Sequence, residues 1–164
     1  MNTKRLLFYW ITSFTIAVTM YYVLKVGFTD NRVFGSWFRM MQYHTDNPIS
    51  FITFPVFFYG IIANYFADNF AKKSRKGQLY LTLIIVILTI LVSSPFGGML
   101  WHYYDMKAGW FPKNWDDKLF GGFSEGLRTG WLIILLSFPY NIFGIAVAYF
   151  LTKKGSIIKP SIIN

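Results

Sequence analysis

The segment FPVFFYGIIANYF, residues 54–66, decides how the chain folds, because it is apolar enough to lie in a membrane and the chain nearly repeats it. Residues 138–150 read FPYNIFGIAVAYF, and Phe, Pro, Gly, Ile, Tyr and Phe occupy the same places in both segments. Six identities among thirteen positions, with proline and glycine in register, favour a duplication over a chance match. The sequence therefore predicts two equivalent membrane-spanning helices.

The repeated proline and glycine have clear physical roles. Pro55 and Pro139 cost little if they lie in the first turn of their helices, and they kink the helices if these begin earlier. Gly60 and Gly144 lie in the middle of each segment, where a missing side chain lets another helix approach closely. We expect the two helices to meet at these glycines.

The composition extends this interpretation to the whole chain. The 164 residues are 54% hydrophobic and only 14% charged, whereas a typical soluble domain carries about 25% charged residues. Four apolar stretches reach the length of about 18 residues that a membrane-spanning helix needs. They cover approximately residues 6–24, 49–70, 79–103 and 131–151. The prediction is one all-α integral membrane domain, residues 1–164, with four transmembrane helices.

The distribution of charge predicts the topology. The net charge is +9, and the excess Lys and Arg gather near both ends and at residues 72–76, whereas loops 27–48 and 104–130 each sum to zero. Short loops rich in Lys and Arg mark the cytoplasmic side. We expect a multi-pass protein of the bacterial cytoplasmic membrane with both termini cytoplasmic. The basic clusters attract anionic membrane lipid, which explains the charge without nucleic acid.

The two outer loops show the one-face apolar spacing of amphipathic helices, at residues 29–42 and 113–128. Such helices lie in the membrane interface. Each loop also holds a Phe-Gly-small-aromatic motif, so the loops resemble one another as the spans do. The chain would then be a tandem repeat of two helical hairpins, residues 1–76 and 77–164.

Four polar residues at the outer ends of spans form the candidate metal cluster: His44, Asp46, His102 and Asp105. Two imidazoles and two carboxylates suit a divalent metal, and the histidines alone suit a haem or a proton relay to a quinone. Neither spacing is a recognised metal motif, however, and such residues more often bond water and headgroups. The sequence therefore predicts no cofactor and keeps the cluster as an alternative.

Three polar residues lie inside predicted spans, where an ionisable group is a functional candidate by default. Asn64 and Asp68 are one helical turn apart, and Asp68 is expected to pair with Lys72 across the next turn. Asn141 is expected to bond across helices.

The stretch SSPFGG, residues 93–98, places Pro95, Gly97 and Gly98 close together in the third span. Proline frees a carbonyl and glycine loosens a helix, so a break is expected here. We interpret it as a packing kink covered by the second outer loop. The alternative is a transporter substrate site, which broken helices often line.

The sequence lacks the motifs of several enzyme classes. It has no P-loop, G-x-S-x-G, H-E-x-x-H or dinucleotide fingerprint, and no Cys for a disulfide or thiolate site. The leading expectation is a non-catalytic protein that binds another membrane component, either another membrane protein or itself. It would serve as a complex subunit, an assembly factor or an immunity-type protein. The alternatives are an oligomeric transporter or channel subunit, and a metal-, haem- or quinone-dependent membrane enzyme.

Overall fold

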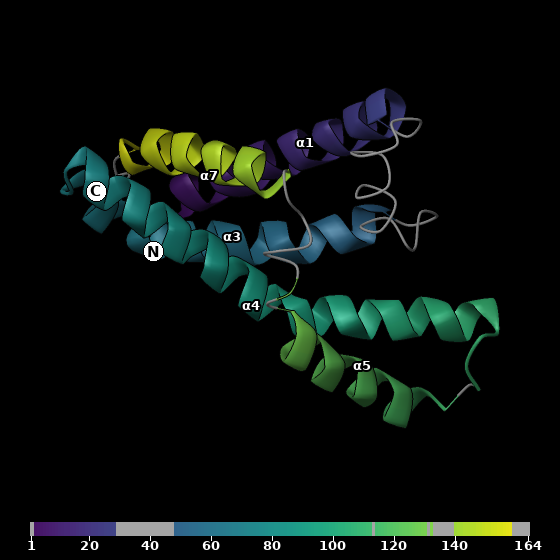
Figure 1. Ribbon diagram of the computed structural model, residues 1–164. Helices are drawn as coiled ribbons and strands as arrows, with labels where there is room; N and C mark the ends of the chain where they lie inside the picture. Colours follow the sequence, from purple (N-terminus) through teal and green to yellow (C-terminus); the bar gives the residue numbers. More distant parts are fainter. Residues whose placement is uncertain (1, 29–47, 113, 131, 133–139, 159–164) are drawn as a thin grey trace.

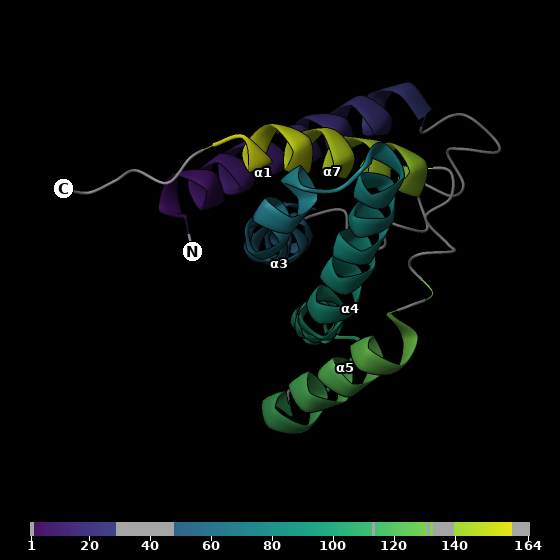
Figure 2. The ribbon, with the colours of Figure 1, turned by 90° about the vertical axis from the view of Figure 1, so that its left-hand side faces the viewer.

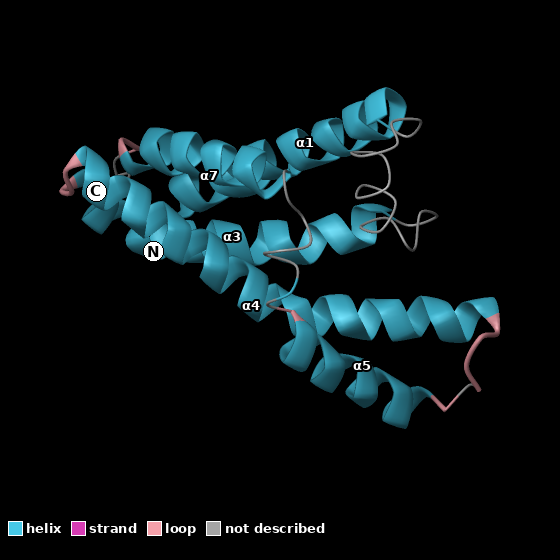
Figure 3. Ribbon diagram, in the orientation of Figure 1, coloured by secondary structure: helices cyan, strands magenta, loops and turns pink. Residues whose placement is uncertain are grey.

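The computed structural model describes residues 2–28, 48–112, 114–130, 132 and 140–158, and this part of the chain is helical without strands (Figure 3). Its helices are α1 (Thr3–Phe28), α3 (Pro48–Ala71), α4 (Arg75–Ala108), α5 (Trp115–Thr129) and α7 (Tyr140–Ser156) (Figure 1). The all-α prediction is confirmed for these residues.

Among the described residues, three helices are long and apolar enough to cross a membrane, which indicates a membrane-embedded protein. They are Thr3–Gly27, Ile49–Ala71 and Arg75–Ala108. These helices match the first three predicted spans. The fourth predicted span remains a prediction, because α7 begins at Tyr140 and residues 131 and 133–139 lie outside the described part.

Helices α1, α3, α4 and α7 pack together in one group, and α5 lies against α4 (Figures 1 and 2). The core of the group is built from residues on all four helices: Tyr9, Tyr59, Ala63, Ile85, Ala148 and Leu151. At about 1.5 Å per residue, the 34 residues of α4 span about 51 Å, much more than the hydrocarbon core of about 30 Å. Helix α5 packs on the part of α4 that lies away from the termini (Figure 1).

Local signals fix both ends of α4. Ser74 is the N-cap, and its hydroxyl accepts a hydrogen bond from the backbone N–H of Gly77 at 3.4 Å. Gly109 ends the helix with φ 83°, a left-handed conformation that glycine adopts without steric cost. The short turn before Ser74 makes α3 and α4 antiparallel neighbours.

The predicted break at residues 93–98 is wrong, because α4 is helical from Arg75 to Ala108 with Pro95 inside it. The helix instead changes direction part-way along its length (Figure 1). A proline bends a helix in this way because it removes one hydrogen bond and crowds the preceding turn. The cover expected from the second outer loop is present, and it is α5.

Aromatic rings join α5 to the rest of the molecule. Phe96 on α4 stacks on Phe54 of α3 at 5.2 Å between ring centroids and contacts Phe58 at the same distance. On its other side Phe96 meets the Phe123 ring of α5 edge-on at 6.1 Å. One phenylalanine therefore links three helices.

Helix α5 forms where the second amphipathic loop helix was predicted. Its expected counterpart, residues 29–42, lies outside the described residues. The internal repeat therefore stays a prediction.

Candidate functional site

Two buried tyrosines donate hydrogen bonds to backbone carbonyls of α7 at the end of the bundle that holds both termini. The Tyr59 hydroxyl donates to the carbonyl of Ala148 at 3.2 Å and lies 3.1 Å from the Thr152 hydroxyl. The Tyr9 hydroxyl donates to the carbonyl of Thr152 at 3.2 Å. A methyl group at Gly155 would overlap the Tyr9 ring, so glycine is needed for this close approach. We call these residues the tyrosine floor.

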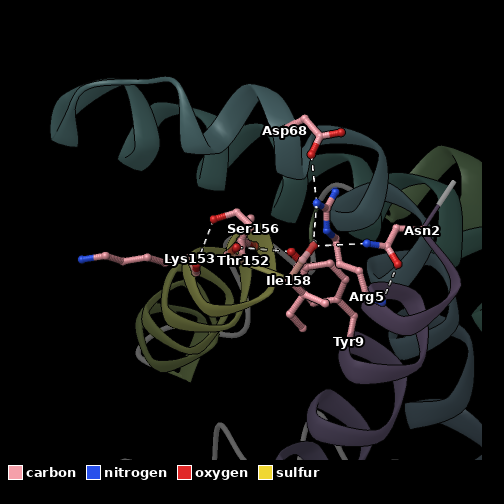
Figure 4. Close-up of polar contacts among 8 residues, drawn as sticks. All are labelled: Asn2, Arg5, Tyr9, Asp68, Thr152, Lys153, Ser156 and Ile158. Atoms are coloured by element: carbon pink, nitrogen blue, oxygen red, sulfur yellow. Dashed lines mark hydrogen bonds and ion pairs between the residues drawn. The ribbon is translucent and has the colours of Figure 1, made fainter. Parts of the chain in front are cut away.

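Beside the tyrosine floor, Arg5 joins α1 to α3 and to the chain after α7 (Figure 4). Arg5 is only 4% exposed. Its Nη2 lies 2.9 Å from Oδ1 of Asp68 and donates to the carbonyl of Ile158 at 3.0 Å. The Asn2 side chain donates to the same carbonyl at 3.1 Å. The two ends of the described chain are thus bonded together.

This contact corrects the expected partner of Asp68. The predicted pair with Lys72 is wrong, because the Asp68 carboxylate pairs with Arg5 from a different helix. The carboxylate is 74% exposed, so Asp68 lies at the edge of the bundle rather than inside it.

A partly open cavity of about 320 Å³ lies between α1, α3, α4 and α7, and Tyr59 and Ala148 of the tyrosine floor line part of it. Its lining is almost entirely apolar, and its hydroxyl-bearing residues are Ser13, Tyr59 and Thr89. Pro55 and Gly144, two of the repeated residues, also line it. It is the candidate binding site of the bundle.

The cavity explains why the predicted glycine contact is wrong. A methyl group at Gly60 would overlap the indole of Trp10 on α1, whereas one at Gly144 would meet no atom within 4 Å. Gly60 therefore admits the Trp10 ring, whose Nε1 donates to the carbonyl of Phe57 at 3.1 Å. Gly144 faces the cavity. The repeated glycines therefore have different roles: Gly60 makes room for an indole ring and Gly144 leaves open space.

Of the two positions considered for the repeated prolines, the structure tests only that of Pro55. Helix α3 begins at Pro48, which places Pro55 in the interior of the helix rather than in its first turn. Pro139 lies outside the described residues.

The polar residues predicted inside the spans are not brought together at one site. Asn64 is 4% exposed, and neither its Nδ2 nor its Oδ1 has a hydrogen-bond partner among the described residues. Asn141 is half-buried near the start of α7. The cross-helix bond expected of Asn141 stays a prediction.

Helix α5 packs on α4 through residues that have little or no side chain. A methyl group at Gly98 of α4 would overlap the carbonyl oxygen of Gly122, and one at Gly126 would overlap the carbonyl oxygen of Ser94. Gly130 lies against the Ser94 side chain. The two helices are therefore in backbone contact. We call α4 residues 94–108 with α5 the α4–α5 hairpin.

The signal for this hairpin was present in the sequence and was missed. Gly122, Gly126 and Gly130 are spaced by four residues, and so are Ser94 and Gly98. Small residues at this spacing form a flat stripe that lets two helices approach closely.

His102 is held inside the hairpin rather than in a metal cluster. Its Nδ1 lies 2.8 Å from the carbonyl oxygen of Lys118, and its Nε2 lies 3.1 Å from Oε2 of Glu125. Asp105 is buried one turn further along α4. His44 and Asp46 lie outside the described residues.

Among the described residues, no group of three or more His, Asp and Glu side chains is placed to hold a metal ion. Both ring nitrogens of His102 already face oxygen atoms of α5, so the imidazole serves to position that helix. No known protein family, curated protein or solved structure matches the chain.

Proposed function

We propose that this is a non-catalytic protein of the bacterial cytoplasmic membrane that binds another membrane protein through its α4–α5 hairpin. The observation that carries the proposal is the exposure of two large apolar side chains on α5. Phe120 is 74% and Leu127 58% exposed, and they lie two turns apart on the same flank of the helix.

The glycine contact gives this exposure its meaning. Helix α5 contacts α4 largely through its backbone, and although Phe123 packs on Phe96, Phe120 and Leu127 stay exposed. Trp110, between α4 and α5, and Trp115, the first residue of α5, are also exposed. Rigid aromatic and apolar anchors of this kind supply much of the affinity in protein interfaces. A rigid helix with exposed apolar side chains suits a docking role.

The alternative functions have less support. The cavity is apolar, and its hydroxyls are engaged with backbone or side-chain partners, which does not favour a path for ions or polar solutes. His102 faces a carbonyl and a carboxylate, so it has no nucleophile to activate. The observations favour binding over transport or catalysis.

The proposed topology places both termini in the cytoplasm and the hairpin outside. It is supported by the basic residues near both ends and by the bond between Asn2 and Ile158, which puts the ends on one side. Reporter fusions should locate Lys76 inside and Asp116 outside. A reporter at Lys76 found outside would overturn this orientation.

The test of the docking role is site-specific photocrosslinking in intact membranes. A crosslinking amino acid at Phe120 or Leu127 should give a discrete adduct with one membrane protein. Phe150 and Ile142 on α7 are matched controls, because both are exposed apolar residues on another helix. They should give no such band.

Two outcomes would contradict the docking role. If Phe120 and Leu127 react only with lipid, α5 is an interfacial anchor instead. If all four positions give equal amounts of adduct, the adducts come from random encounters with other membrane proteins and not from a docking site on α5.

A further inference from the structure

We propose that the cavity between α1, α3, α4 and α7 binds one acyl chain of a membrane phospholipid. This site lies away from the α4–α5 hairpin and does not depend on the partner proposed for it.

The cavity has the dimensions of a hydrocarbon chain. Its lining on α1 runs from Ser13 to Leu24, a length of about 16 Å at roughly 1.5 Å per residue. This is about half of the 30 Å hydrocarbon core, which is the depth of one leaflet. Its volume of about 320 Å³ is within the range of sites that hold small ligands, about 300–1,000 Å³.

The hydroxyl groups of the lining are already used. Ser13 donates to the carbonyl of Tyr9 at 2.5 Å, and Thr89 donates to the carbonyl of Ile85 at 2.8 Å. Tyr59 donates to α7, as described for the tyrosine floor. A polar ligand would therefore leave its own groups unpaired, which is costly in an apolar site. Water is disfavoured for the same reason. An alkyl chain has no polar group to satisfy.

The tyrosine floor fixes the direction in which the acyl chain enters the cavity. Tyr59 lines the cavity at the end nearer both termini, and Tyr9, Arg5 and Asp68 lie beyond it. The lipid headgroup therefore lies toward the other end of the cavity, near Leu24, and the methyl end of the acyl chain points at Tyr59.

Gly144 makes room for the ligand. A Cβ there meets no atom within 4 Å, although the residue lies among the lining of the cavity. A larger side chain at this position would project into the empty space without displacing the protein. The same helix offers a matched control, because Ala146 is exposed and does not line the cavity.

The test uses the full chain in vesicles that contain a phosphatidylglycerol with a photoreactive diazirine in its acyl chain. Labelled residues are mapped by peptide mass spectrometry. We expect the label to favour lining residues such as Val147 and Ala17 over outward residues of the same helices, such as Phe150 and Ile11. Gly144→Leu should reduce the label on the lining about tenfold, because it fills the space of a few methylene groups.

The controls keep the proposal falsifiable. Ala146→Leu should leave the labelling pattern unchanged, and the thermal stability of Gly144→Leu should match or exceed that of the wild type. If Gly144→Leu fails to fold, Ala17→Leu on α1 repeats the test from the opposite wall. Equal labelling of lining and outward faces would overturn the proposal. A lining label that persists in both Gly144→Leu and Ala17→Leu would also overturn it, because the label would then not depend on the space in the cavity. A lining label absent from the wild type would overturn it as well, because the acyl chain would then not enter the cavity.

Discussion

The tyrosine floor and the α4–α5 hairpin hold helices together in opposite ways. At the floor, long side chains from α1 and α3 reach across to carbonyls of α7. In the hairpin, Gly98 and Gly122 bring two backbones into contact and leave no space between them. Side-chain hydrogen bonds hold the tyrosine floor, whereas the absence of side chains at glycine lets the two helices of the hairpin approach closely.

The difference has an energetic consequence. Apolar helices gain little from burying surface against one another in lipid, so close packing and hydrogen bonds must hold them. Where several hydrogen bonds hold helices together, a single substitution removes only one of them, and each contributes about 0.6 kcal/mol in a membrane. A backbone contact tolerates no added carbon atom. We therefore expect the hairpin to be the more sensitive of the two.

The largest effect is expected at the hairpin. Gly98→Ala places a methyl group against the Gly122 carbonyl, and neither backbone can move away without separating the helices. We expect a loss of about 1–3 kcal/mol in the free energy of unfolding, the usual cost of overpacking. The measurement is denaturation in mixed micelles.

Gly97→Ala is the matched control, because its methyl group would meet no atom within 4 Å. It should be neutral or slightly stabilising, since alanine favours a helix over glycine by about 1 kcal/mol. Equal losses in the two variants would show that the helices are not in backbone contact.

A smaller effect is expected at the tyrosine floor. Tyr59→Phe removes the hydrogen bond to Ala148 and the contact with Thr152 but keeps the ring in place. We expect a loss of about 1 kcal/mol, because the remaining bonds of the floor are intact. Tyr65→Phe on the exposed face of the same helix should change the stability by less than about 0.5 kcal/mol. A Tyr59→Phe loss above that of Gly98→Ala would reverse the comparison.

Much of the fold could be predicted from the sequence, because helix length and apolar periodicity are local properties. Three spans and α5 fall where these properties placed them. The continuity of α4 through Pro95 was not predicted, since the neighbouring Phe96 packs against rings of α3 and α5, which lie far away in the sequence.

The side-chain partners were harder to predict, because they depend on which helices become neighbours. The local option for Asp68 was Lys72, one turn away, but the fold brings Arg5 to it instead. Gly60 and Gly144 look equivalent in the sequence, yet one meets Trp10 and the other a cavity. His102 was grouped with residues at the same end of the spans, although its partners are on α5.

The smallest effect is expected from the contact between the side chains of His102 and Glu125. Glu125→Gln removes the charge but keeps an oxygen that can face the imidazole at the present 3.1 Å. The Glu125 side chain is 63% exposed, and exposed pairs contribute only about 0.2–1 kcal/mol. We expect hydrogen exchange of the α5 amides to change little, because Gly122 and Gly126 hold the helix through its backbone. Ser124→Ala, on the exposed side of α5, serves as the control. A Glu125→Gln variant whose α5 amides exchange as fast as those of Gly98→Ala would mean that side chains hold the hairpin. The contrast with the tyrosine floor would then be lost.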